Sequence, residues 1–480
     1  SSSAQTWDPH KLVTIYSTDS TPKVSYSFDP SKTDTLNASI TATGVGSVDQ
    51  NGVLSPAETS SLEARFHLVR ENGQWRIDAP ADGVVVSQAS FTASHELVSL
   101  MFLSATGDSL IADPRWYPTR RVETHMLEGL IAGPQSHLSD ALVNAIPSGT
   151  SISAGGIELS DHVAKVSLNG TLPSDDRGKQ LMAWEISQTL QRSGRVNSVE
   201  INVGGEVLPS SGLPSQPSFD LDSAVAFNSN GLVQIDGRSV STRILPIAPS
   251  PSASLPAVSP VSSSLLAWRE DDRLILVDSS SNATRVVDGS EGQYSPSIDR
   301  FGWVWDIPRG GNLRASRIDG QNLPIASENQ SLSGVSAVRI SPDGARALLL
   351  RQVGGSTSAW IAGIERRGSG EPIALTDPEP LAGLSTGVDD VSWAGRSTVV
   401  AVRQGGLRVG NDQVDEVSLV TVPVGGFPSV LALPTGTQRL SAGSSSTTMV
   451  IRGKDGNYQV RSGALWQSLE GNLRDVNFPG

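Results

Sequence analysis

The feature that most constrains this chain is a unit that recurs through its C-terminal half. Each unit has a Ser/Pro-rich approach, a strand with an aromatic or long apolar residue, a turn with Asp or Gly, and a second strand. The units start near residues 256, 293, 335, 388 and 438. Their spacing brackets the ~40–50 residues of a four-stranded propeller blade. The repeat therefore predicts an all-β propeller over residues 213–480.

The two ends of this repeat region read as two parts of one further unit. Residues 474–480 have the pattern of the opening strand of a unit that ends after this strand. Residues 224–227 and 231–235 have the pattern of a unit without its opening strand. Pairing both pieces in one sheet would close the ring and hide both sheet edges. We therefore expect six blades closed by the C-terminal strand, with five or seven blades as the alternatives.

Residues 1–94 show the alternation of apolar and polar residues that is typical of β-strands. The longest run, residues 62–68, alternates Leu, Ala, Phe and Leu with polar residues, and Asn72-Gly73 after it is a strong hairpin signal. The pattern predicts an α+β domain, mostly β, built as a meander with one solvated face. Since no convincing amphipathic helix is present to cover the other face, we expect further helical residues before Ser1.

Residues 95–212 predict a small α/β domain and a linker. An apolar strand is expected over residues 97–103, and Asp113-Pro114 is expected to break the chain after it. The order of elements is β, α, β, α, β, which predicts two helices packed on one face of a small sheet. The Pro/Ser/Gly-rich stretch 209–217 has the composition of an interdomain connection.

The two expected helices of this domain differ in their start signals. Thr119 can cap the first, whereas Asp175 and Asp176 place oxygen acceptors and negative charge at the first turn of the second. The expected buried stripe of the second helix consists of Met182, Ala183, Ile186 and Leu190.

The chain lacks the residue sets that common catalytic and metal chemistry require. It has no cysteine, which excludes a disulfide framework, a thiolate zinc site and a thiol nucleophile within it. His95-Glu96 is not followed by the second His of a zinc helix. Residues 383–387 fit the G-x-S-x-G pattern of a hydrolase, but no His follows them, so a loop of the propeller is favoured. We therefore predict no catalytic residues, no metal and no cofactor.

Several acidic and aromatic residues admit a functional and a structural interpretation. The adjacent acids Asp271-Asp272 and Asp389-Asp390 could form an acid/base pair, but neighbours in a strand point apart, so solvated turns are favoured. Trp303 and Trp305 could stack on sugars, although core packing is favoured. The remaining candidates are the Asp-Gly pairs at Asp343, Asp319 and Asp455, interpreted as turns rather than calcium loops, and the six histidines, interpreted as surface or hydrogen-bonded residues.

The charge and hydropathy of the chain limit its partners. The net charge is −13, the isoelectric point is about 5.0 and no basic block occurs, so nucleic acid is not expected as a partner. No apolar run approaches the ~20 residues of a membrane helix. The chain opens with Ser1-Ser2-Ser3 and shows no signal peptide, so we expect that any export signal has been removed.

Four short stretches resemble a GerMN domain, the α+β module of spore-germination lipoproteins. They are Asp-Pro-Arg-Trp-Tyr-Pro at 113–118, Leu-Glu-Gly-Leu-Ile-Ala-Gly-Pro at 127–134, Ala-Ile-Pro-Ser-Gly-Thr at 145–150 and Val-Ala-Lys-Val-Ser-Leu at 163–168. With Leu-Met-Ala-Trp-Glu-Ile at 181–186 and a propeller behind them, the whole chain resembles the LpqB-type lipoproteins of actinobacteria.

This resemblance implies a cone-shaped N-terminal domain with leading helices and a lipid-modified cysteine that is absent from this chain. It implies an extracytoplasmic protein anchored to the outer face of the cytoplasmic membrane. The implied partner is the extracellular domain of a sensor histidine kinase like MtrB, whose signalling on envelope maintenance and division the protein modulates without catalysis. The alternative is a cell-wall glycan or peptide binding protein, or a hydrolase, that acts through the propeller face.

Overall fold

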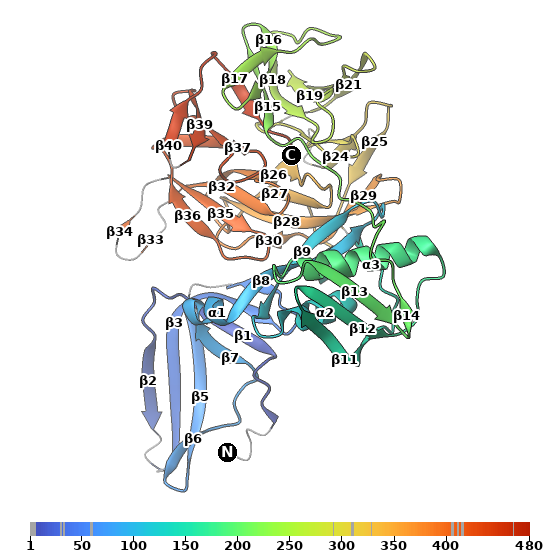
Figure 1. The fold of residues 1–480 in the computed structure, drawn as a ribbon. Helices are drawn as coiled ribbons and strands as arrows, with labels where there is room; N and C mark the ends of the chain where they lie inside the picture. The colour runs from blue at the N-terminus through green and yellow to red at the C-terminus, as the bar shows by residue number, and fades with distance from the viewer. Residues whose placement is uncertain are drawn as a thin grey trace.

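The computed structural model describes residues 6–28, 31, 34–57, 61–290, 292–308, 312–327, 329–404, 408–409, 412–413, 417–463 and 465–480. Ser1, Ser2 and Ser3, on which the prediction of a removed export signal depends, lie outside these residues. An open sheet, a unit with two long helices and a group of small sheets follow one another along the chain (Figure 1). None of the described helices is long and apolar enough to cross a bilayer.

The N-terminal sheet has seven strands in the part of the chain that is described. They are β1 (Leu12–Tyr16), β2 (Lys23–Phe28), β3 (Thr35–Asp49), β4 (Leu54–Pro56), β5 (Ser61–Glu71), β6 (Gln74–Asp78) and β7 (Val84–Ser87). The order is β6-β5-β3-β1-β7, and β2 and β4 also pair with β3. Because β1 pairs parallel with β7, the prediction of a simple meander is wrong. The chain crosses over to bring β7 beside β1, and a parallel pair needs such a crossover.

The turn between β5 and β6 confirms the Asn-Gly hairpin signal. Asn72 and Gly73 have φ angles of 51° and 77°, in the left-handed region that Asn and Gly adopt most readily. A Cβ atom on Gly73 would meet nothing within 4 Å, so the backbone conformation alone favours glycine here.

One face of the N-terminal sheet carries apolar side chains that remain open to solvent. Tyr26 and Phe28 on β2 are 62% and 66% exposed, and Trp75 and Ile77 on β6 are also exposed. A groove of about 700 Å³ lies against part of this sheet. The predicted apolar face is therefore present, and the expectation of further helical residues that would cover it stays a prediction.

Helix α1 (Gln88–Ser94) leads directly from the N-terminal sheet into strand β8 (His95–Ser104). Ser87 caps this helix, because its hydroxyl accepts a hydrogen bond from the backbone N–H of Ser90. Its buried side chain is Phe91. Seven residues with one buried side chain carry no periodic signal, so the sequence pattern does not predict this helix.

The next unit has two sheets rather than the one small sheet that was expected. Its further elements are β9 (Leu110–Pro118), α2 (Val122–Ala132), the 3-10 helix η2 (Ser136–Leu138), β10 (Leu142–Val143), β11 (Ser151–Ser160), β12 (Val163–Asn169), α3 (Asp176–Gln191), β13 (Ser198–Val203) and β14 (Glu206–Val207). The sheet orders are β10-β8-β9 and β11-β12-β13-β14. Each of α2 and α3 contacts both sheets, and their apolar residues form one core. Asp113-Pro114 lies inside β9 and does not break the chain there.

The start of α3 confirms its predicted cap, whereas the start of α2 does not. The Asp175 carboxylate accepts a hydrogen bond of 2.7 Å from the backbone N–H of Gly178, and Asp176 lies in the first turn. The predicted cap Thr119 lies outside α2, whose N-cap is Arg121 with a φ of 59° and no side-chain hydrogen bond. The predicted stripe of α3 is fully buried at Met182, Ala183, Ile186 and Leu190.

The C-terminal half forms six small antiparallel sheets and one separate hairpin among the described residues. The first sheet holds β15 (Ser223–Asn228), β16 (Gly231–Asp236), β17 (Ser239–Thr242) and β41 (Arg474–Asn477). The second holds β18 (Ala253–Val258), β19 (Leu265–Glu270), β20 (Arg273–Asp278) and β21 (Ala283–Asp288). The third holds β22 (Ser297–Ile298), β23 (Val304–Asp306), β24 (Leu313–Ser316) and β25 (Asn322–Ile325).

The other three sheets continue this order along the chain. The fourth holds β26 (Val335–Ile340), β27 (Arg346–Val353), β28 (Ser356–Arg366), β29 (Pro372–Leu375) and β30 (Glu379–Pro380). The fifth holds β31 (Val388–Trp393), β32 (Thr398–Gln404), β35 (Val417–Pro423) and β36 (Ser429–Ala432). The sixth holds β37 (Thr437–Ala442), β38 (Met449–Gly453), β39 (Tyr458–Ser462) and β40 (Leu465–Ser468), and the separate hairpin is β33 (Arg408–Val409) with β34 (Asp412–Gln413).

The last strand of the chain belongs to the first of these sheets. β41 pairs antiparallel with β15, and Asn477 lies opposite Val225. This is the pairing that the two partial units of the sequence predict. β18 contacts both β15 and β41, so the second sheet packs beside this joint (Figure 1).

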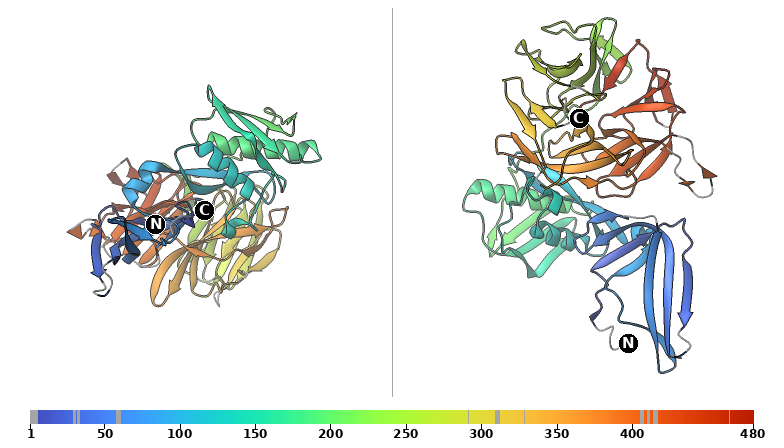
Figure 2. Two further views of the ribbon diagram at one scale, coloured as in Figure 1. Left: turned by 90° about the horizontal axis from the view of Figure 1, so that it is seen from below. Right: turned by 180° about the vertical axis from the view of Figure 1, so that it is seen from behind.

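The middle unit contacts the C-terminal half through aromatic and ionic side chains. Trp116 on β9 donates from Nε1 to the carbonyl oxygen of Gly425 at 2.8 Å, and its ring packs against Phe427. Arg300 forms an ion pair with Asp108. The N-terminal sheet points away from the C-terminal half, with the middle unit beside both (Figure 2).

Candidate binding site in the C-terminal half

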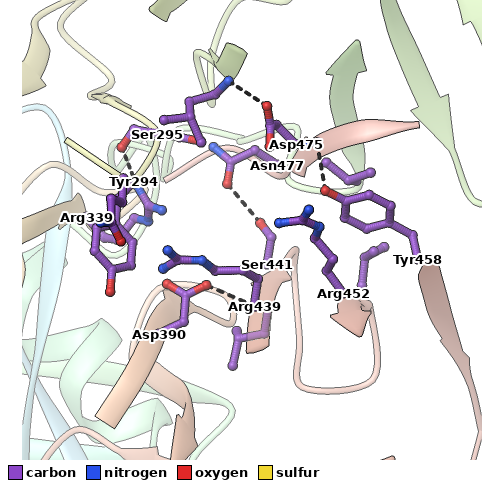
Figure 3. Close-up of a pocket in the computed structure, with 15 residues that line it drawn as sticks. Tyr294, Ser295, Arg339, Asp390, Arg439, Ser441, Arg452, Tyr458, Asp475 and Asn477 are labelled. Atoms are coloured by element: carbon purple, nitrogen blue, oxygen red, sulfur yellow. Dashed lines mark hydrogen bonds between the residues drawn. The ribbon is translucent and has the colours of Figure 1, made fainter. Parts of the chain in front are cut away.

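A polar cavity of about 110 Å³ lies where the first strands of several C-terminal sheets converge (Figure 3). Its lining residues are Leu255, Gln293, Tyr294, Ser295, Arg339, Asp390, Arg439, Leu440, Ser441, Val450, Arg452, Tyr458, Asp475, Val476 and Asn477. Three arginines and two aspartates belong to this set. Charged side chains are rarely buried unless they are paired, so their gathering here needs a specific explanation.

The deepest charged groups of the cavity are Arg339 on β26 and Asp390 on β31, which are 5% and 3% exposed. The backbone N–H groups of Leu440 and Val391 each donate to Asp390 at 3.0 Å. Burial raises the pKa of Asp390, although Arg339 and Arg439 nearby oppose this effect. Burial also lowers the pKa of Arg339, whose guanidinium donates to the carbonyl oxygen of Ser295 at 2.6 Å. The side chains are therefore fixed by the backbone of neighbouring sheets.

Tyr294 and Arg439 form one side of the cavity. The Arg439 guanidinium lies over the Tyr294 ring, 4.1 Å from its centre, which is cation–π geometry. The Tyr294 hydroxyl donates to the carbonyl oxygen of Asp389 at 2.8 Å. Burial raises the pKa of Tyr294, so the phenol stays neutral at physiological pH.

The opposite side of the cavity involves the C-terminal strand. The backbone N–H of Asp475 donates to the Tyr458 hydroxyl at 2.7 Å, and the Asp475 carboxylate accepts from the N–H of Leu255 at 3.1 Å. The Ser441 hydroxyl donates to Asn477 Oδ1 at 3.1 Å. These contacts tie β41 to β18, β37 and β39, which belong to other sheets.

The two adjacent acid pairs, Asp271-Asp272 and Asp389-Asp390, lie in different environments. Asp271 has a φ of 54° in the exposed turn between β19 and β20, as expected. Asp389 accepts a hydrogen bond from Gln404, whereas Asp390 enters the cavity, so the two side chains do not act as a pair. The interpretation of Asp390 as a solvated turn residue is wrong, because Asp390 lies within β31 and is buried.

The two tryptophans that could have stacked on sugars are buried in the core. Trp303 and Trp305 are 1% and 0% exposed, among the apolar residues of the third and fourth sheets. Trp305 Nε1 donates to the Asp299 carboxylate at 2.9 Å. Neither indole presents a free face to a sugar, so the interpretation as core packing is confirmed.

The loop residues considered as motifs have structural roles. Gly383 and Gly387 have φ angles of 72° and 70° and flank a loop between β30 and β31. Asp343 accepts from the backbone N–H of Ala345 at 3.1 Å, and Gly344 after it has a φ of 75°, which is turn geometry. The described residues contain no cluster of three His, Asp or Glu side chains arranged to hold a metal ion.

His137 departs from the expectation that the histidines are surface or hydrogen-bonded residues. It lies against the C-terminal half, its Nε2 is buried without a hydrogen-bond partner, and its Nδ1 is 3.5 Å from Glu379. Burial, with a smaller effect of Arg346, lowers the pKa of His137 to about 4. The ring is therefore neutral at physiological pH.

The three arginines of the cavity were not predicted from the sequence. Arg339 interrupts the apolar strand β26, and Arg452 ends the apolar part of β38. Each of the two arginines therefore lies within one of the repeated units that the sequence predicts. A charged residue inside an otherwise apolar strand is a usable signal for a polar interior site. The sequence could not show that the three side chains meet, because Arg339 lies in the fourth sheet whereas Arg439 and Arg452 lie in the sixth.

Three family models and several curated proteins match this chain. Residues 1–92 match the family model for the lipoprotein LpqB N-terminal domain, residues 99–209 match the model for sporulation and spore germination, and residues 229–479 match the lipoprotein LpqB beta-propeller domain. A lipoprotein LpqB from Streptomyces coelicolor is 26% identical over 99% of this chain and 85% of its own length. One from Rhodococcus jostii is 24% identical over 83% of this chain and 71% of its own length. TolB from Acinetobacter baumannii is a similar solved structure, at 14% identity and a TM-score of 0.37, and the match covers 69% of this chain and 99% of TolB.

The fold and the matched domains define a multidomain, mostly β protein with a GerMN-like domain and a β-propeller-type domain. More specifically, the chain belongs to the LpqB lipoprotein family. The predicted limits of the three domains, at residues 94 and 212, stay predictions.

Proposed function

We propose that this protein is an exported, non-catalytic lipoprotein at the outer face of the cytoplasmic membrane. In this proposal it binds the extracellular domain of a membrane sensor histidine kinase like MtrB and modulates its signalling on cell-envelope maintenance and division. The observation that carries the proposal is family membership, since the LpqB N-terminal, spore-germination and LpqB beta-propeller models match successive parts of a single chain. The curated relatives are named lipoproteins, which supports the proposed location.

Three features of the molecule support the proposal of an interaction protein. The buried Asp390 is held by backbone N–H groups, and the candidate motif at 383–387 is a structural loop. Contacts such as Trp116 with Gly425 and Arg300 with Asp108 join the middle unit to the propeller-type domain. A partner could therefore contact more than one domain at once.

We propose further that the six C-terminal sheets are the six blades of a closed ring, with β41 as the first strand of the first blade. The inner strands contact one another in sequence, from β18 to β22, β26, β31, β37, β41 and back to β18. The pairing of β41 with β15 supports closure at the point where the chain ends meet. Closure without free edges would suit a protein that works outside the cell without cysteine cross-links.

Direct binding is the experiment that tests the proposed function. The whole chain is immobilised and titrated with the purified extracellular domain of the MtrB-like kinase from the same organism. We expect saturable binding with a dissociation constant of about 10 μM or tighter, which is typical of a regulatory contact. The control is the extracellular domain of an unrelated sensor kinase of similar size and charge, which is expected not to bind.

Kinase output in cells provides the second measurement. Deletion of the gene is expected to change the phosphorylation of the response regulator that the kinase serves. No binding at about 100 μM together with unchanged output would contradict the proposal.

The alternative from the sequence is a protein that binds cell-wall glycan or peptide, or hydrolyses it, through the propeller face. The polar cavity favours the binding part of this alternative, because it contains charged side chains that a small ligand could reach. Turnover of cell-wall fragments that is lost in Asp390→Asn would support the hydrolase. Binding of cell-wall fragments without turnover would support a binding protein and contradict the hydrolase.

A further inference from the structure

The cavity of Figure 3 has more positive than negative side chains. Arg339, Arg439 and Arg452 face it together with two carboxylates, Asp390 and Asp475, which leaves one positive charge in excess. Burial makes an uncompensated charge costly, because the surrounding protein replaces water poorly as a solvent for ions. The cavity therefore favours a negatively charged occupant.

The acceptors of the cavity are largely used by the protein itself. Both oxygens of Asp390 accept from backbone N–H groups, and Asp475 accepts from the backbone of Leu255. The Ser441 hydroxyl donates to Asn477 and accepts from the backbone N–H of Phe478 at 2.8 Å. A ligand that brings donors would thus find few acceptors that are still available.

Two donor groups, in contrast, are left without protein acceptors. Asn477 is 5% exposed, and its Nδ2 is buried with no hydrogen-bond partner, while its Oδ1 is occupied by Ser441. The Arg452 guanidinium has no hydrogen-bond or ion-pair partner among the described residues, and Figure 3 places its tip beside Asn477 and Ser441. A buried donor without an acceptor, such as Asn477 Nδ2, costs about 1–3 kcal/mol, and the Arg452 guanidinium is half-buried, so both groups are expected to serve a ligand or solvent.

We propose that this cavity binds a small anionic group, either a carboxylate or a tetrahedral oxyanion, whose oxygens accept hydrogen bonds from Arg452 and Asn477. Arg439, held over Tyr294, adds positive charge beside them. The volume of about 110 Å³ admits one such group with a few water molecules at ~30 Å³ each. The site is independent of the proposed kinase contact, because its donors lie inside the propeller-type domain.

Calorimetric titration of the whole chain tests this proposal at constant ionic strength. The probes are inorganic phosphate, acetate, N-acetyl-alanyl-alanine and the C-terminal amide of the same dipeptide. We expect saturable binding of at least one anion and no binding of the amide. Phosphate binding identifies a tetrahedral oxyanion as the ligand, whereas binding of acetate or of the dipeptide acid identifies a carboxylate.

Two variants assign the binding to the named donors. Arg452→Gln removes the charge, and Asn477→Asp replaces the free donor by a negative oxygen while it keeps the acceptor for Ser441. Each is expected to weaken anion binding about tenfold or more. The matched control is Arg238→Gln on the exposed turn between β16 and β17, which is expected to bind as the unmodified protein does.

The result that overturns the proposal is equally specific. The proposal is overturned if no anion binds, or if the amide of the dipeptide binds as tightly as the acid. It is also overturned if Arg238→Gln weakens anion binding as much as Arg452→Gln does. Circular dichroism and the melting temperature are measured for each variant. If Arg452→Gln fails to fold, Asn477→Asp decides alone, because its shape is nearly that of asparagine.

Discussion

Removal of residues 473–480 is expected to abolish the cooperative folding of the C-terminal half. Leu473, Val476 and Phe478 are buried in one cluster with Ala226 and other residues of the first sheet. Their burial contributes about 2 kcal/mol each, and the deletion also removes the hydrogen bonds of β41. The sum approaches the ~5–15 kcal/mol that stabilises a whole domain. Thermal melts followed by tryptophan fluorescence should show the loss of the main transition.

Two point variants give stability changes with which the effect of this deletion can be compared. Phe478→Ala in the full chain is expected to cost about 3–4 kcal/mol and to keep a cooperative transition, because the strand itself remains. Leu465→Ala on β40 is the control, since this side chain is exposed and its loss should change stability by less than about 0.5 kcal/mol. A truncated chain that melts at the temperature of the full chain would contradict the proposed closure of the ring by β41.

The features that the sequence predicted correctly depend on residues close together in the chain. Asn72 and Gly73 form a turn by their own conformations, and Asp175 caps α3 through a group only three residues away. The strands of each repeated unit are also neighbours in sequence, so their apolar patterns predict them well. The joint of β41 with β15 is a long-range exception that was predicted because each end alone was an incomplete unit.

The features that the sequence did not reveal depend on distant parts of the chain. The parallel pairing of β1 with β7 follows from packing and not from any local pattern. Arg339 lies in the fourth sheet and Arg439 and Arg452 lie in the sixth, and only the arrangement of these two sheets brings the three side chains into one cavity. Asp390 looked like half of an exposed Asp-Asp pair, because one sequence cannot show which face of a strand is buried.

The second large effect is expected at Glu185, a fully buried acid on α3. Its two carboxyl oxygens accept from the backbone N–H groups of Leu103 at 3.3 Å and Ala145 at 2.8 Å. Glu185→Ala leaves both donors unsatisfied and creates a cavity, for an expected cost of about 3–5 kcal/mol. Hydrogen exchange in peptides from β8 and α3 measures this loss within the middle unit. The exposed Glu200→Ala on β13 is the control and should leave the exchange unchanged.

The same residue predicts a pH dependence that Glu185→Gln should remove. Burial raises the pKa of Glu185 from 4.5 to about 8, although its two hydrogen bonds oppose the shift. The folded protein therefore keeps a proton that the unfolded chain releases. This contribution to stability is complete below pH 4.5 and is lost as the pH rises through about 8. At about 1.36 kcal/mol per pH unit, the unmodified protein should lose about 3–5 kcal/mol relative to Glu185→Gln between pH 5 and 8. Parallel stability profiles for the two proteins would contradict this prediction, because they would mean that Glu185 is already ionised in the folded state.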